Sequence, residues 1–207
     1  MGGQIAGEAG KYLKERGHMI RECHALDPAG PYFDGGSDEV NLDKSDCGLV
    51  QVIHTSASHS TATSIEEFPL LRIGTSKKVG HCDWWINCGH YQNEKCLHPD
   101  YVEMYEAFRN STKKGDDGPL FQNLQQQLFC SHNRGGIIYV SAVKRKCNFI
   151  SYVCNNCDQG ESDECTSDIT KEPNSLPPDA KCTPDMNVNY LLHTEPSGDF
   201  CNSGKIS

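Results

Sequence analysis

Residues 24–33 read HALDPAGPYF, and this short run decides how the chain on either side of it is interpreted. It begins inside Met19 to Leu26, which we predict to be a short strand, and it ends in a Pro/Gly cluster typical of a turn. Asp27 therefore lies at the end of a buried strand, with a proline behind it that restricts its backbone. A carboxylate fixed there suits the orientation of a catalytic histidine; the alternative is an aspartate that caps the turn.

The segment before this run, residues 1–16, has the periodicity of a helix that ends at Gly17. Its apolar residues recur at helical spacing. Its small residues leave one side almost bare of side chains, so that the helix can lie close to a sheet: Gly3, Ala6, Gly7 and Gly10.

Behind the run, residues 34–48 form an acidic, glycine-rich loop, followed by a β-branched segment, Leu49 to His54, that we predict to be a buried strand. Asp43 and Asp46 stand three positions apart in the loop. Such carboxylates, completed by backbone carbonyls, can converge on a hard cation such as calcium. The alternative is a solvated acidic loop.

Further along, Gly136 to Val143 is apolar and is predicted to be a helix or a strand packed on the core, and residues 189–194 a strand. Residues 161–184 are expected to be a loose tail. Strands that alternate with helices indicate an α/β architecture.

A second stretch with chemical potential is CSHNR at residues 130–134. Its histidine, His132, follows a cysteine by two positions, and a bridged cysteine would give that histidine a rigid anchor. The alternative is a histidine with a purely structural role.

The composition narrows the function classes. The 207 residues include 28 acidic and 19 basic ones, for a net charge of −9, and contain no Lys/Arg block, which argues against a nucleic-acid partner. No apolar stretch reaches the length of a membrane span. Twelve cysteines favour an oxidising compartment, although the N-terminus has no signal-peptide pattern.

Four blocks, in order, resemble the secreted animal lipases, the α/β-hydrolases related to pancreatic lipase and to the secreted phospholipases A1. Residues 26–33 match the pattern LDPAxPxF. Residues 42–46 and 52–55, LDxSD and VIHT, match the next block. GHxDWWxN at 80–87 is similar to the third, and CSHxR at 130–134 to the block that carries the catalytic histidine.

This resemblance implies an α/β-hydrolase fold, with flanking helices on a sheet and several disulfides. It implies that Asp27 is the aspartate and His132 the histidine of a Ser-Asp-His triad. It also implies a structural calcium ion, bound by the side chains of Asp43 and Asp46 and by the carbonyls of Asp38 and Asn41. Catalysis in this family needs no cofactor.

The nucleophile is the element that the sequence does not contain. The family carries it in Gly-x-Ser-x-Gly, which is absent here, but MGGQIAG at residues 1–7 resembles the residues that directly follow that serine. We therefore expect Met1 to be an internal residue whose backbone N–H is one oxyanion-hole donor. The chain would then be the C-terminal part of one catalytic domain, without its early strands and signal peptide, and inactive as it stands.

The resemblance also assigns the cysteine-rich parts. A Cys96–Cys130 bridge would close a lid, residues 97–129, which holds two apolar-striped segments and a glycosylation sequon at Asn110. A Cys-rich tail would span residues 147–207, with no lipid-binding β-sandwich after it. Cys154–Cys165 resembles a family bridge, and Cys82 with Cys88 departs from the family pattern; we expect these two to pair with each other.

The sequence thus predicts a secreted hydrolase of lipid carboxylic esters, a triacylglycerol lipase or a phospholipase A1, that acts at a lipid–water interface. The oligomeric state is left open. An alternative is a lipid-binding or yolk-type storage relative without activity. A third interpretation, a cysteine-rich extracellular module, would require the four ordered blocks to be coincidental. Intact Asp27 and His132 favour the enzyme.

Overall fold

The computed structural model describes residues 1–30, 32–57, 73–89, 96, 129–157, 165–195 and 200–201. Its centre is a mixed β-sheet in the order β1-β2-β3-β7-β4-β5. Four neighbouring strands run parallel: β1 (Cys23–Leu26), β2 (Val50–His54), β3 (Cys82–Ile86) and β7 (Val188–Leu192). The predicted α/β architecture is confirmed.

The other strands run antiparallel at the far side of the sheet. β4 (Ile150–Cys154) pairs with β7, and two short strands pair with β4: β5 (Ser167–Asp168) and β6 (Asn174–Ser175). Two 3-10 turns complete the described elements, η1 (Lys44–Asp46) and η3 (Asn87–Gly89).

The middle strands β2 and β3 are buried along their whole length. Their sequences, VQVIH and CDWWI, carry large side chains on both faces of the sheet, as central strands of a covered parallel sheet do. On one face, Trp84 packs with Ile138 of the second helix and Tyr190 of β7 in the main core cluster. On the other face, Trp85 packs with Leu191 and three buried cysteines, Cys88, Cys154 and Cys157.

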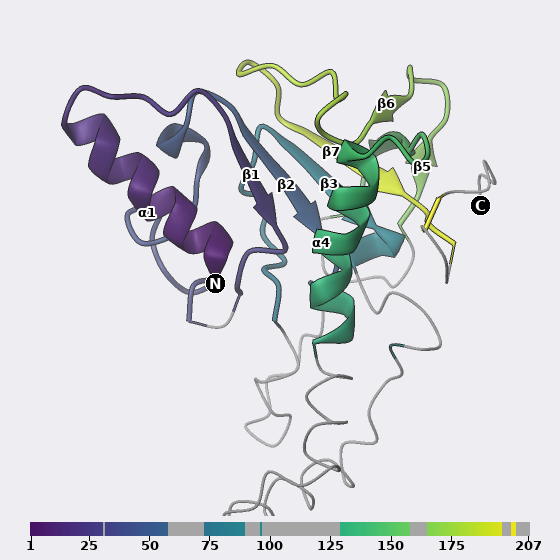
Figure 1. Ribbon diagram of the computed structural model, residues 1–207, viewed down its shortest axis with the longest axis horizontal. Helices are drawn as coiled ribbons and strands as arrows, with labels where there is room; N and C mark the ends of the chain where they lie inside the picture. The colour runs from purple at the N-terminus through teal and green to yellow at the C-terminus, as the bar shows by residue number, and fades with distance from the viewer. Residues whose placement is uncertain are drawn as a thin grey trace, which may run out of the picture.

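Two helices contact β1, α1 (Gly2–Glu15) and α4 (Cys130–Val143). Figure 1 shows that α1 begins on the lower side of the molecule, toward which the arrowheads of β1 and β2 point, and that α4 begins on that side too. The starts of both helices therefore lie at the carboxyl ends of the parallel strands, where open α/β sheets bind their ligands.

The small residues of α1 let the helix approach its neighbours, as predicted. A Cβ atom on Gly7 would lie 2.9 Å from Leu42 Cα, and one on Gly10 would lie 2.4 Å from the Asp46 carbonyl oxygen. Gln4, also on this face, donates to Ala29 O at 2.7 Å and accepts from Leu42 N at 2.8 Å. The acidic loop is thus fixed directly against α1.

Five disulfides connect the elements: Cys23–Cys47, Cys82–Cys182, Cys96–Cys130, Cys147–Cys201 and Cys154–Cys157. The expected Cys96–Cys130 bridge is confirmed. The expected Cys82–Cys88 and Cys154–Cys165 bridges are wrong. Cys82 turns toward the tail that leads into β7, and Cys154 pairs within its own turn. Cys165 lies against Cys88, with its N–H 3.2 Å from Cys88 Sγ.

The bounds of several elements differ from those predicted from the sequence. The first strand starts at Cys23, later than the predicted Met19, and the run 136–143 is the second half of a longer helix. The tail predicted to be loose holds β5 and β6, because its backbone pairs with β4. Apart from Phe129, the lid segment 97–129 lies outside the described residues, as does the sequon at Asn110.

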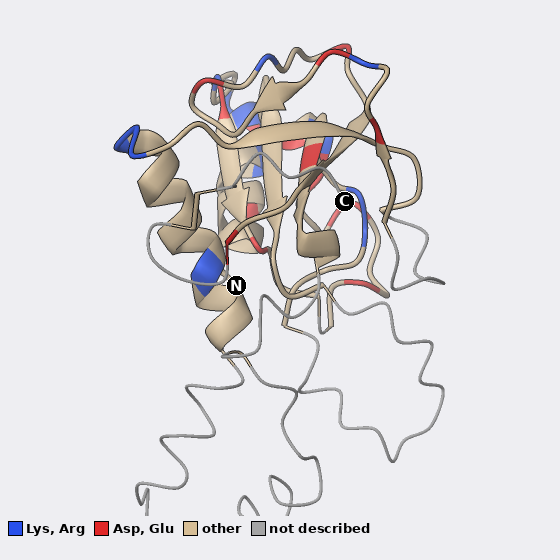
Figure 2. Ribbon diagram, turned by 90° about the vertical axis from the view of Figure 1, so that its right-hand side faces the viewer, with Lys and Arg blue, Asp and Glu red and all other residues tan. Residues whose placement is uncertain are grey.

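Among the described residues, no helix is long and apolar enough to cross a bilayer. Figure 2 shows basic and acidic residues interspersed over the visible side of the described chain.

The close contact at Gly10 generates a stability prediction. We expect Gly10→Ala to lower the free energy of unfolding by about 1–3 kcal/mol, because its Cβ would overlap a backbone carbonyl that cannot move away alone. Gly2→Ala is the matched control on the same helix, since nothing lies within 4 Å of its added Cβ. Urea unfolding of both variants measures the difference. Equal stability of the two would contradict the packing described for α1.

Candidate functional site

Asp27 and His132 meet at the carboxyl ends of the parallel strands, although 105 positions separate them in the sequence. His132 Nδ1 lies 2.6 Å from Asp27 Oδ2. Asp27 is fully buried, and the His132 side chain is 25% exposed. The structure thus brings together the two residues that the sequence predicted to act as a pair.

The Asp27 carboxylate is held by the end of the neighbouring strand. Its Oδ1 accepts hydrogen bonds from Thr55 N at 2.8 Å and Ser56 N at 2.9 Å, and its Oδ2 accepts one from the Ser56 hydroxyl. Charge-assisted bonds of this kind offset the desolvation of a buried carboxylate. Asp27 itself has a positive φ of 46°, an uncommon conformation that turns its side chain at the end of β1.

A glycine closes the opposite side of this carboxylate. A Cβ atom on Gly74 would lie 2.5 Å from Asp27 Oδ1, so only glycine lets this backbone approach. The Gly74 N–H donates to Ser56 Oγ at 3.0 Å. The carboxylate is therefore enclosed by backbone from two segments that are distant in sequence.

His132 belongs to the first turn of α4, two positions after the bridged Cys130. Asn133 N donates to Phe129 O at 2.8 Å. This first hydrogen bond of the helix spans Cys130 and His132. The expected rigid anchor is thus present. Since Nδ1 donates to Asp27, the neutral ring keeps its lone pair on Nε2, the tautomer that can accept a proton from a hydroxyl group.

Met1 is the N-cap residue of α1, and its carbonyl accepts from Gln4 N at 3.0 Å. The helix therefore starts at the position for which the sequence predicted an oxyanion-hole donor. Backbone N–H groups at a helix start carry partial positive charge and suit an anion.

The predicted calcium ligands are only partly gathered. Lys11 of α1 reaches into the acidic loop and donates to the Asn41 carbonyl and, at 3.2 Å, to Asp46 Oδ2. Asp43 instead caps η1: its carboxylate accepts from Ser45 N, while its own N–H donates to Asp46 Oδ2 at 3.0 Å. Asp38 is exposed.

Asp46 is the buried member of this set. Burial raises the pKa of its carboxyl, against the lowering effects of the Asp43 N–H and the Lys11 ammonium. Its Oδ1, like the Asn41 side-chain oxygen, is buried and has no hydrogen-bond partner among the described residues. A buried carboxylate oxygen without a hydrogen-bond partner is the type of donor that a hard cation takes.

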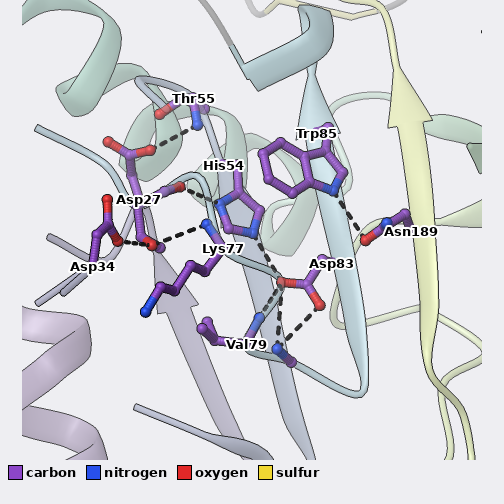
Figure 3. Close-up of polar contacts among 11 residues, drawn as sticks. Asp27, Asp34, His54, Thr55, Lys77, Val79, Asp83, Trp85 and Asn189 are labelled. Atoms are coloured by element: carbon purple, nitrogen blue, oxygen red, sulfur yellow. Dashed lines mark hydrogen bonds and ion pairs between the residues drawn. The ribbon is translucent and has the colours of Figure 1, made fainter. Parts of the chain in front are cut away.

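Sequence reasoning missed a second histidine–aspartate pair. His54 at the end of β2 and Asp83 of β3 form a buried pair, with 2.8 Å between Nε2 and Oδ1 (Figure 3). His54 Nδ1 also lies 3.2 Å from the Thr75 carbonyl oxygen. His54 and Asp83 stand inside the quoted blocks VIHT and GHxDWWxN. These blocks are therefore the sequence signal that contains both residues.

Comparison with known proteins agrees with this geometry. The protein-family model described as Lipase matches residues 1–200. Pancreatic lipase-related protein 2 of Bos taurus and that of Homo sapiens are each 33% identical over 167 residues. In both cases the match covers 80% of this chain and 31% of the relative. A protein named Inactive pancreatic lipase-related protein 1, from Mus musculus, is 29% identical over 165 residues.

The chain spans about a third of the length of these relatives, since the matched region is 31% of the first. The family match, in contrast, extends over almost all of the 207 residues. Together with the mixed sheet, its flanking helices and the paired Asp27 and His132, these matches show that the chain belongs to the lipase family.

Proposed function

We propose that the complete protein hydrolyses carboxylic esters of lipids, with His132 as general base and Asp27 as the carboxylate that orients it. The hydrogen bond between His132 Nδ1 and the fully buried Asp27 carboxylate carries this proposal. The bond fixes the ring in the tautomer that leaves Nε2 open for the proton of a serine hydroxyl. When that proton arrives, the adjacent carboxylate stabilises the resulting imidazolium.

The nucleophile and part of the oxyanion hole belong to the proposal as well. The 207 residues contain no Gly-x-Ser-x-Gly, so we assign the serine to the position just before Met1 in the complete protein. Met1 N–H would then be the donor that follows the nucleophile. The chain alone would bind the ester without cleaving it, and a signal peptide would direct the complete protein to secretion.

Two features support a lipid substrate at an interface. Phe129 is 43% exposed, and its ring centroid lies 6.3 Å from that of His132, so an apolar surface adjoins the proposed base. Five disulfides fit an extracellular location, where lipid aggregates are the natural substrate of a lipase. Triacylglycerols and phospholipids both fit these features.

A lipid-binding relative without turnover is the second candidate, because one similar protein carries the name inactive. The two candidates differ at one position. A serine before Met1 gives hydrolysis, whereas another residue there leaves only binding. The enclosed Asp27 and its bond to His132 favour hydrolysis, since lipid storage needs no such pair.

The role of Asp27 can be measured in the complete protein, obtained by reading the transcript upstream of the Met1 codon. We expect Asp27→Asn to lower kcat by about 10⁴-fold while the fold persists, because asparagine favours the wrong histidine tautomer. Hydrolysis of tributyrin and of a phosphatidylcholine emulsion is the assay. The 207-residue chain serves as the blank. Ester turnover by that chain, or full activity of the Asp27→Asn enzyme, would contradict the proposal.

We also propose that the acidic loop binds a structural calcium ion. Asp46 Oδ1 and the Asn41 carbonyl would hold it, with the Asp43 side chain and the Asp38 carbonyl completing the ligand set. The orphaned, buried Asp46 oxygen supports this assignment. The ion would neutralise the negative charge of the loop that packs on α1. In the structure, the Lys11 ammonium contacts the same loop at the Asn41 carbonyl and at Asp46 Oδ2.

Calcium should therefore stabilise the chain. At a concentration 100-fold above Kd we expect about 2.7 kcal/mol of added stability, seen as a higher Tm in a thermal scan. Asp46→Asn should abolish the increase, whereas Asp38→Asn should retain it because only the carbonyl of residue 38 is assigned as a ligand. An equal Tm increase in all three chains, or none in the wild type, would contradict the site.

A further inference from the structure

The His54–Asp83 pair is the most deeply buried ion-pair geometry of the described chain, and the mechanism above does not use it. Both side chains have no exposed surface. His54 Nε2 lies 2.8 Å from Asp83 Oδ1, and His54 Nδ1 lies 3.2 Å from the Thr75 carbonyl oxygen. Figure 3 shows the His54 ring directed toward Asp83, with the Trp85 ring next to it.

Both contacts of the His54 ring are to oxygen atoms. A backbone carbonyl has no proton to donate, and Asp83 already accepts from Val79 N at 3.2 Å and from Gly80 N at 3.0 Å. Both partners of the ring can only accept, so the contacts fit a ring in which each nitrogen donates, that is, an imidazolium beside a carboxylate. The Trp85 ring stacks on it at 3.9 Å with an interplanar angle of 7°, as an aromatic face does on a cation.

The Thr75 carbonyl links this pair to Asp27. Thr75 N donates to Pro28 O at 2.8 Å, next to Asp27 in sequence. Its neighbour Gly74 donates to Ser56 Oγ at 3.0 Å, and that hydroxyl in turn donates to Asp27 Oδ2. The Gly74–Thr75 turn is therefore held by His54 on one side and encloses the Asp27 carboxylate on the other.

We propose that His54 and Asp83 are positioning residues of the Asp27–His132 pair: their ion pair fixes the Gly74–Thr75 turn, and the turn fixes the Asp27 carboxylate. The inference rests on the proposed function for its catalytic meaning. Neither residue touches substrate. Their contribution is to hold Asp27 Oδ2 in the direction of His132 Nδ1.

A purely structural pair would behave differently. Replacing a buried ion pair by apolar groups is often neutral or stabilising, whereas removing one partner leaves an uncompensated charge. Stability and positioning can therefore be separated. A double variant that removes both charges recovers stability but does not recover the hydrogen bond to the Thr75 carbonyl.

The test is NMR on the full 207-residue chain. The wild type should show a downfield His132 Nδ1–H resonance, and both ring nitrogens of His54 should have shifts of protonated nitrogen. In His54→Phe, which keeps the stacked ring, we expect the His132 proton to exchange with solvent roughly tenfold faster, about the factor that one hydrogen bond contributes. The double variant His54→Phe, Asp83→Asn should be more stable than the single one and exchange equally fast.

Trp84→Phe is the matched control. Trp84 is the neighbour of Asp83 on β3, is fully buried and donates to Ser151 Oγ at 3.1 Å, on the face of the sheet away from His54. This variant should lose stability without faster exchange of the His132 proton. Its result separates a general loosening of the fold from a local loss of positioning.

Three outcomes would overturn the inference: wild-type exchange in His54→Phe, restored exchange in the stabilised double variant, or equally fast exchange in Trp84→Phe. A wild-type chain without the downfield proton would overturn it too, together with the Asp27–His132 pair. If that proton is present and responds to His54→Phe while the complete protein proves inactive on esters, the positioning stands and only the proposed function fails.

Discussion

The hydrogen bond between His132 Nδ1 and Asp27 Oδ2 joins the first turn of α4 to the end of β1. Much of the described structure serves to make that contact possible. A fully buried carboxylate must be surrounded by donors, and the chain supplies backbone N–H groups from the turn after β2 and a hydroxyl from Ser56. The sheet register decides that this turn lies beside Asp27, since Leu26 pairs with Ile53.

Close packing around the pair depends on glycines, which have no side chain. Gly74 lies against the carboxylate, and Gly135 of α4 lies so close to β2 that a Cβ would be 3.1 Å from Thr55 Oγ1. The Cys96–Cys130 disulfide holds the start of α4. The backbone at Gly74 and Gly135 and the disulfide at Cys130 thus surround the pair. The His132 ring is its exposed member.

The sequence was sufficient for the parts that rest on local signals. The glycine pattern of residues 1–16 predicted a close-lying helix, and the end of a buried strand predicted the place of Asp27. The strand at 82–86 was missed, because CDWWI is short and has no regular alternation of apolar and polar residues to reveal it. The Cys82–Cys182 pairing joins residues 100 positions apart and depends on which loops the sheet brings together, which spacing alone does not contain. His54 and Asp83 stood in the quoted blocks, but only the fold shows that they meet.

The central claim, that Asp27 and His132 serve a serine that precedes Met1, is tested most directly by covalent labelling. A lipid-like phosphonate reacts with a serine only when an adjacent base activates it. Peptide mass spectrometry of the labelled complete protein should find the phosphonyl group on the residue directly before Met1. Phosphonyl on a different residue, or a protein that stays unlabelled while it binds the lipid, would contradict the account.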